Sequence, residues 1–200
     1  MLQLAILISG RGSNMQAIHR AIVEGRLDAE IVLVLSDQAA AAGLHYARAA
    51  GLATAVIEKS KTENREAFTA RLIAAIEAAA PDYIALAGFM RILAPAFIRR
   101  FPDRILNIHP SLLPEFPGLH AQRQALEAKA RISGCTVHFV DEGCDTGPIL
   151  AQRKVPILPE DSEAVLSARI LEQEHLLYPE CLQLLAEGRV KVESGKVILI

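Results

Sequence analysis

The sequence predicts an α/β fold with a Rossmann-like, mostly parallel sheet, helices on both of its faces and a single compact domain. Short apolar runs typical of buried strands alternate with segments of helical period, and the links between them are short. Strands that alternate with helices in this way are joined by right-handed crossovers, which makes the sheet parallel. The 200 residues are 52% hydrophobic, which is enough to bury a full core.

The first half of the chain alternates regularly. Continuous apolar runs predict buried strands at residues 4–8, 31–35, 53–57 and 83–87. Helical spacing and alanine content predict helices over about 14–25 and 39–50. Ser60 and Glu63 fit a capping box, which predicts a third helix that opens there and ends at Pro81.

The second half is less regular. We expect strands at 105–108, 135–140 and 149–155, a hairpin at 190–200, and short helices near 95–100 and 122–129. Residues 110–118 hold three prolines and predict a stiff loop. A long helix is expected from Asp161-Ser162 to about Leu177, with a kink or restart at Pro179. The chain is therefore one domain, 1–200, with a first half of about 1–100 and a second of about 101–200.

Charge and composition exclude several classes of protein. Lys and Arg number 21 and Asp and Glu 23, so nucleic acid is not an expected partner. No apolar run approaches the roughly 18 residues of a membrane span, so no membrane partner is expected. The first residues carry no Lys or Arg and do not resemble a secretory signal. Three widely spaced cysteines indicate reduced thiols and a cytoplasmic protein; they are Cys135, Cys144 and Cys181.

The first candidate site is the turn Ser9-Gly-Arg-Gly-Ser-Asn14, between the first strand and the first helix. Glycines allow a ligand to approach the backbone, and a helix N-terminus offers free N–H groups to an anion. Met15 replaces the third glycine of a dinucleotide motif and no P-loop lysine follows, so a single phosphomonoester fits best. The alternative is an ordinary tight turn between strand and helix.

The second candidate is Asn107-Ile-His109 at the end of a predicted buried strand. Residues two apart on a strand point to the same side, so an amide and an imidazole lie together. The carboxyl edge of a parallel sheet is where ligands bind in such folds. The alternative is a strand-end Asn that caps a loop and a histidine satisfied in the core.

The third candidate is the loop 141–148, DEGCDTGP, whose glycines and proline could carry Asp145 over the sheet edge. A carboxylate beside His109 would favour the charged imidazolium. The alternative is a solvated acidic turn. Two further arrangements are disfavoured. His109, His120, His138 and Asp145 show no metal-ligand spacing, and Ser111 is not in a nucleophile-elbow motif that would pair it with His109 and Asp145.

Five segments in order identify a resemblance that covers essentially the whole chain. They are ISGRGSNMQAI at 8–18, LAGFMRIL at 86–93, LNIHPSLLPEFPGLHAQRQAL at 106–126, GCTVHFVDEGCDTGPIL at 134–150 and QEHLLYP at 173–179. The middle three match enzymes that use formyl-tetrahydrofolate in general. With the first and last, the chain resembles the glycinamide ribonucleotide formyltransferase family, folate-dependent enzymes of purine biosynthesis.

The resemblance implies the roles of specific residues. The nucleotide phosphate would bind Gly12, Ser13 and Asn14, and the ribose hydroxyls would contact Glu174. The folate would be held by a larger set, with the loop Asp141–Asp145 closing on the pterin; this set is Arg65, Met90, Arg91, Ile92, Leu93 and Asn107. The catalytic trio would be Asn107, His109 and Asp145. Thr146 stands where a glycine is frequent in the family, which would stiffen the pterin edge.

The resemblance also implies the reaction. The formyl group of 10-formyltetrahydrofolate, a co-substrate, would pass to the amine of glycinamide ribonucleotide, with no metal and no covalent enzyme intermediate. The protein would act as a monomer or weak homodimer. A formyltetrahydrofolate hydrolase is the nearest alternative, but such enzymes usually carry an extra N-terminal domain. A methionyl-tRNA formyltransferase would need a further C-terminal domain and more positive charge. A non-catalytic nucleotide-binding module would need the glycine turn alone.

Overall fold

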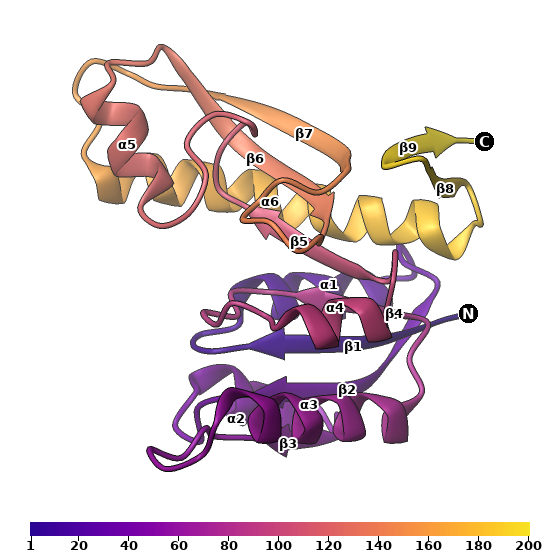
Figure 1. The fold of residues 1–200 in the computed structure, drawn as a ribbon. Coiled ribbons are helices and arrows are strands. Elements are labelled where there is room, and N and C mark those ends of the chain that lie inside the picture. The colour runs from indigo at the N-terminus through magenta and orange to yellow at the C-terminus, as the bar shows by residue number, and fades with distance from the viewer. The chain divides into compact units, whose positions relative to one another are not determined.

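The computed structural model describes residues 1–200, which form two compact units, Met1–Leu106 and Asn107–Ile200 (Figure 1). The division falls within strand β5 (Ile105–His109), slightly later than the division near residue 100 expected from the sequence.

The first unit is a parallel α/β layer structure. Its strands pair in the order β3-β2-β1-β4, and every one of these pairs is parallel. The strands are β1 (Leu2–Ile8), β2 (Ala29–Ser36), β3 (Thr54–Val56) and β4 (Tyr83–Leu86). The helices are α1 (Ser13–Val23), α2 (Ala42–Ala49), α3 (Arg65–Ala79) and α4 (Pro95–Arg100). Alternating elements and parallel pairing confirm the predicted α/β class.

The helices of the first unit form two pairs. Helix α1 contacts α2, and α3 contacts α4. Right-handed crossovers that step from β1 to β2 to β3 put α1 and α2 on one face of the sheet. The return from β3 to β4 then puts α3 on the other face. The carboxyl ends of β1 and β4 thus meet at one edge, where Ser9 N–H donates to the Gly88 carbonyl over 3.1 Å.

Helix α3 begins later than the sequence predicts. The bonds of a capping box do form: Ser60 Oγ accepts from Glu63 N–H at 3.1 Å, and Glu63 Oε2 accepts from Ser60 N–H at 3.4 Å. They close a turn and do not open the helix. The N-cap is Asn64, whose side chain accepts from Ala67 N–H at 2.8 Å. The predicted start at Ser60 is therefore wrong, because a second capping residue follows the first at once.

The second unit combines a short sheet with one long helix. Its strands follow the order β5-β6-β7, and β6 (Ile132–Phe139) pairs antiparallel with β7 (Ile149–Pro156). Helix α5 (Ala121–Glu127) precedes β6, and helix α6 (Glu163–Ala186) packs on both β6 and β7. A hairpin of β8 (Val190–Glu193) and β9 (Lys196–Leu199) follows, as predicted.

Helix α6 continues through Pro179, so the predicted end near Leu177 is wrong. A proline inside a helix removes one backbone hydrogen bond and costs about 3 kcal/mol. Residues on both sides of it are buried, Tyr178 and Cys181 among them, and each buried large side chain contributes about 1.5–3 kcal/mol. Packing of this apolar face on the sheet therefore outweighs the local cost of the proline.

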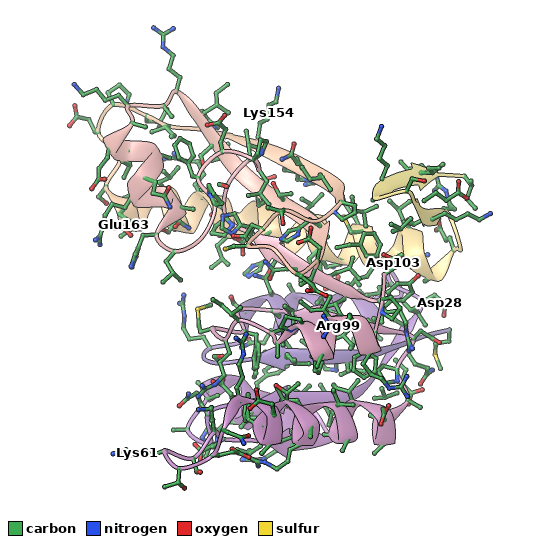
Figure 2. All side chains as sticks on the ribbon, viewed as in Figure 1. Asp28, Lys61, Arg99, Asp103, Lys154 and Glu163 are labelled. Atoms are coloured by element: carbon green, nitrogen blue, oxygen red, sulfur yellow. The ribbon has the colours of Figure 1, made fainter.

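Exposed lysines project from both units, whereas Asp37 and Glu174 are buried. Figure 2 shows Lys61 before α3 and Lys154 on β7 projecting away from the ribbon, and both are exposed. No helix of the chain is long and apolar enough to cross a membrane.

Candidate active site

Three polar side chains of the second unit meet where β5 ends. Asn107 and His109 lie on β5, and His109 is only 5% exposed. Asp145 comes from the loop that joins β6 to β7. Its backbone is left-handed, with φ +56°, a conformation that Asp and Asn adopt more readily than most residues. The predicted convergence of these three residues is present in the structure.

The Asp145 carboxylate faces the His109 ring. Asp145 Oδ2 lies 3.4 Å from His109 Nδ1 and accepts the Gly118 backbone N–H at 2.8 Å. On the opposite side of the ring, His109 Nε2 lies 2.9 Å from the Phe116 carbonyl oxygen. Both ring nitrogens therefore face oxygen acceptors, and these two contacts orient the ring.

His138, on β6, is a fourth member of this cluster that the sequence did not assign to it. Its Nδ1 lies 2.8 Å from the Phe139 carbonyl, which can only accept, so Nδ1 carries the proton. Burial lowers the pKa of His138. The Phe139 carbonyl and the Asp145 charge act in the opposite direction but do not offset it. The neutral ring then accepts at Nε2 from Asn107 Nδ2, 3.2 Å away.

This bond fixes which way the Asn107 amide points. Because His138 Nε2 is an acceptor, the NH2 group of Asn107 and not its oxygen must face it. One N–H is used there, and the second remains for a ligand. Neighbouring polar residues at alternate positions of β6, Thr136 and His138, could have indicated that this face of the strand is polar.

The depressed pKa of His138 predicts a pH dependence of stability. In the unfolded chain this histidine titrates near its ordinary value of 6.5 and in the fold below it. Between pH 6.5 and the lower pKa of the folded state, the unfolded chain therefore binds more protons than the folded chain. The free energy of unfolding falls as the pH is lowered through this range. We expect the free energy of unfolding in urea to drop more between pH 7.5 and 5.5 in the wild type than in His138→Gln. Equal drops in both proteins would show that His138 is not held neutral.

The loop 141–148 is held by its own side chains. Asp141 Oδ1 accepts from the Thr146 hydroxyl at 2.7 Å and from Gly143 N–H at 3.1 Å. Gly147 approaches β6 so closely that a Cβ would lie 1.9 Å from the Phe139 carbonyl oxygen. Thr146 thus contributes a bond that a glycine there could not make. This internal bracing holds the backbone on either side of Asp145.

The cysteines are not set up as nucleophiles. Burial, then the Asp145 charge, raises the pKa of the exposed Cys144, whose Sγ lies 3.7 Å from Asp145 Oδ2. Burial raises the pKa of Cys135 and of Cys181 to about 12. Reactive cysteines need the thiolate, so all three environments favour the inert thiol.

The other arrangements considered from the sequence find little in the structure. The Ser111 hydroxyl is fully buried and donates to the Glu115 carbonyl within its own loop. It also lies 3.3 Å from the Phe116 carbonyl, so both of its contacts brace the loop. No group of three or more His, Cys, Asp or Glu side chains lies in an arrangement that could hold a metal ion.

The glycine turn of the first unit, the predicted phosphate site, lies at the N-terminus of α1. Gly12 is the N-cap of α1 with φ +67°, and it has no side chain to occupy the first-turn N–H groups. A Cβ on Gly12 would lie 3.2 Å from the Gly43 Cα, and one on Gly43 would lie 2.6 Å from Ile8 Cδ1. Gly43 N–H also donates to the Gly10 carbonyl at 3.0 Å. Gly43, which the sequence did not single out, lets α2 pack against this turn. Ser13 and Asn14 follow in the first turn of α1.

The predicted folate segment lies in the loop between β4 and α4. Arg65, at the start of α3, donates from Nη2 to the Leu93 carbonyl at 3.4 Å. Met90 and Ile92 are 71% and 86% exposed, whereas Leu93 is buried. The structure therefore brings Arg65 to this segment and leaves two apolar side chains in solvent.

Glu174 lies in the second unit on α6 and is buried. Its charge is the second-largest cause, after burial, of the raised pKa of Cys135. Helix α6, which carries Glu174, packs on β6, which carries Cys135. The ribose role expected from the resemblance stays a prediction.

Comparison with known proteins identifies the family to which the chain belongs. The formyl transferase family model matches residues 2–182. Phosphoribosylglycinamide formyltransferase of Escherichia coli is 47% identical over 97% of this chain and 92% of its own length. Glycinamide ribonucleotide transformylase 1 of Symbiobacterium toebii has a crystal structure with a TM-score of 0.97 and 46% identity, covering 100% of this chain and 94% of its own.

A longer relative also contains a matching region. The trifunctional purine biosynthetic protein adenosine-3 of Drosophila pseudoobscura pseudoobscura is 50% identical over 94% of this chain, which spans only 14% of that protein. The family resemblance predicted from the sequence is thus confirmed. The chain belongs to the formyl transferase family and, within it, to the phosphoribosylglycinamide formyltransferases.

Proposed function

We propose that this chain transfers the formyl group of 10-formyltetrahydrofolate to the amine of glycinamide ribonucleotide, and that the Asn107, His109 and Asp145 cluster carries the transfer. The observation that supports the cluster's role most is the Asp145 carboxylate, 3.4 Å from His109 Nδ1 and anchored on Gly118 N–H. The names of the full-length relatives support the substrates.

The first step forms a tetrahedral intermediate. The amine nitrogen attacks the formyl carbon, a C–N bond forms, and the carbonyl electron pair moves to oxygen. Two N–H donors would stabilise this oxyanion: the second N–H of Asn107 Nδ2 and His109 Nε2–H. In the structure His109 Nε2–H donates to the neutral Phe116 carbonyl. An oxyanion is a stronger acceptor than a neutral carbonyl, so the donor would pass to it.

The second step moves a proton and breaks a bond. The attacking nitrogen loses a proton, the folate nitrogen gains one, and the bond between the formyl carbon and that nitrogen breaks. Asp145 would hold the His109 ring charged and oriented, or order a water that carries the proton between the two nitrogens. The products are formylglycinamide ribonucleotide and tetrahydrofolate, with no change of oxidation state. No enzyme-bound formyl group is required, which agrees with the inert cysteines and the engaged Ser111.

Substrate binding is proposed residue by residue. Gly12, Ser13 and Asn14 would bind the phosphate through first-turn N–H groups and polar side chains. Glu174 would accept from the ribose hydroxyls. The folate would contact the exposed apolar side chains and polar backbone of its segment; the proposed residues are Arg65, Met90, Arg91, Ile92, Leu93 and Asn107. No metal takes part in the proposed mechanism.

The partners proposed are the two small-molecule substrates. Asn107, His109 and Asp145 belong to one chain, so a monomer suffices for the trio, and a weak homodimer would work equally well. Three free cysteines fit a reducing compartment and support a cytoplasmic location.

The test is an assay of tetrahydrofolate release with and without glycinamide ribonucleotide. We expect release only when the acceptor is present, with one formylated acceptor formed per tetrahydrofolate. Release at the same rate without the acceptor would identify a hydrolase. Binding of the nucleotide with no release under either condition would leave only a binding module, and the proposed reaction would be wrong.

A further inference from the structure

Asp37, directly after β2, is a nearly buried carboxylate with three partners from the first unit. It is 3% exposed. Its Oδ1 accepts the Ser9 hydroxyl at 2.6 Å, and its Oδ2 accepts from Arg91 Nε at 2.5 Å and from Gln38 Nε2 at 3.2 Å. A buried charge is costly unless it is paired and hydrogen-bonded, so this set of bonds is a built arrangement.

Ser9 carries the effect of Asp37 to the loop after β4. Its hydroxyl donates to Asp37 and at the same time accepts the Met90 backbone N–H at 2.8 Å. Its own N–H donates to the Gly88 carbonyl at 3.1 Å. The backbone of residues 88–90 is therefore bonded to the end of β1 at two points, and one of them depends on the hydroxyl that Asp37 orients.

Arg91 is the second link between Asp37 and this loop. Its guanidinium is held by the carboxylate on one side, and its Cζ lies 5.3 Å from the centroid of the Phe68 ring. Asp37 thus fixes both the backbone before Arg91 and the Arg91 side chain. The two neighbours of Arg91 in sequence, Met90 and Ile92, are the exposed apolar residues of the predicted folate segment.

We propose that Asp37 is a positioning residue for the folate. Through Ser9 and Arg91 it fixes the segment 88–93 in the conformation that binds 10-formyltetrahydrofolate. Asp37 acts on the protein and not on the substrate, so its loss weakens folate binding and leaves the transfer step itself intact. This inference rests on the proposed function, because it assumes that the segment 88–93 holds the folate.

The test compares Asp37→Asn with a matched control. The asparagine oxygen can still accept a hydrogen bond from the Ser9 hydroxyl. Its NH2 group then faces the Arg91 guanidinium, and because both groups are donors, the bond to Arg91 is lost. We expect the KM for 10-formyltetrahydrofolate to rise about tenfold, with kcat and the KM for glycinamide ribonucleotide within about twofold of the wild type. The control is Asp161→Asn in the second unit, where Asp161 forms an equally buried pair with Arg169 at 2.7 Å. Asp161→Asn should lower stability and leave both KM values unchanged.

A second pair of variants covers a failure of Asp37→Asn to fold. Ser9→Ala removes the hydroxyl that joins Asp37 to Met90 N–H, and Ser9→Thr keeps it. We expect Ser9→Ala to raise the folate KM about threefold or more and Ser9→Thr to restore it.

Two results would overturn the proposal: an unchanged folate KM in Asp37→Asn or Ser9→Ala, or a parallel change in kcat and both KM values. Failure of the proposed function gives a different result, since the wild type itself would then show no acceptor-dependent release.

Discussion

Asp145→Asn is expected to lower kcat on the order of 100-fold while the protein stays folded. Asparagine has the same shape and also adopts a left-handed backbone, so φ +56° is kept. Its oxygen can still accept Gly118 N–H, but the negative charge beside His109 Nδ1 is gone. The ring then loses the partner that holds it charged and oriented. Steady-state kinetics with both substrates, with thermal unfolding in parallel, measure the effect.

The matched control for this variant is Asp103→Asn. Asp103 is exposed and also has a left-handed backbone, with φ +54°, so it receives the same chemical change in the same conformation. We expect its kcat to equal that of the wild type. Near-normal turnover in Asp145→Asn would show that this carboxylate is not part of the reaction.

His109→Ala is expected to lower kcat roughly 100-fold or more, since one oxyanion donor is typically worth about 3 kcal/mol of barrier. The loss should appear in kcat more than in either KM, because the donor acts on charge that develops only in the transition state. His109 is buried, so removal of the ring leaves a cavity and takes one of two donors from the Phe116 carbonyl, which keeps the Ser111 hydroxyl at 3.3 Å; both effects lower stability.

Two further variants separate stability from catalysis at this position. His109→Gln keeps an N–H donor in the buried site and should be more stable than His109→Ala while still losing most of kcat. His45→Ala removes an exposed histidine of α2 and should change nothing. If His109→Ala retains wild-type kcat at a temperature where it is folded, the ring is not an oxyanion donor.

Much of the fold could be predicted from the sequence because its strands are continuous apolar runs ended by polar or glycine residues. The runs at residues 4–8 and 105–108 became β1 and β5 with little change. The errors occur where two local signals compete. Asn64 caps α3 although Ser60 and Glu63 form capping-box bonds, and the buried face of α6 continues past Pro179. Local propensity does not reveal which signal tertiary packing will favour.

The convergence of Asn107, His109 and Asp145, the proposed catalytic trio, could be predicted because each member has a local reason for its position. Asn107 and His109 are two apart at a strand end, and Asp145 lies in a loop shaped by glycines. His138 was considered only in a disfavoured metal set, because its bond to Asn107 depends on which residue lies beside it across the sheet. Gly43 was missed for the same reason, since only the close approach of α2 to the glycine turn requires it. Asp37 lacks any local motif, and its role depends on partners 28 and 54 residues away in sequence.

A double-mutant cycle of Asp145→Asn and His109→Ala tests most directly whether the cluster acts as a unit. The rate constant for formyl transfer is measured in a single turnover with both substrates saturating, in the wild type, both single variants and the double variant. If Asp145 acts through His109, the double variant transfers formyl about as fast as the slower single variant. Losses that multiply in the double variant, or a wild-type rate in either single variant, would contradict a mechanism in which this carboxylate holds this imidazole.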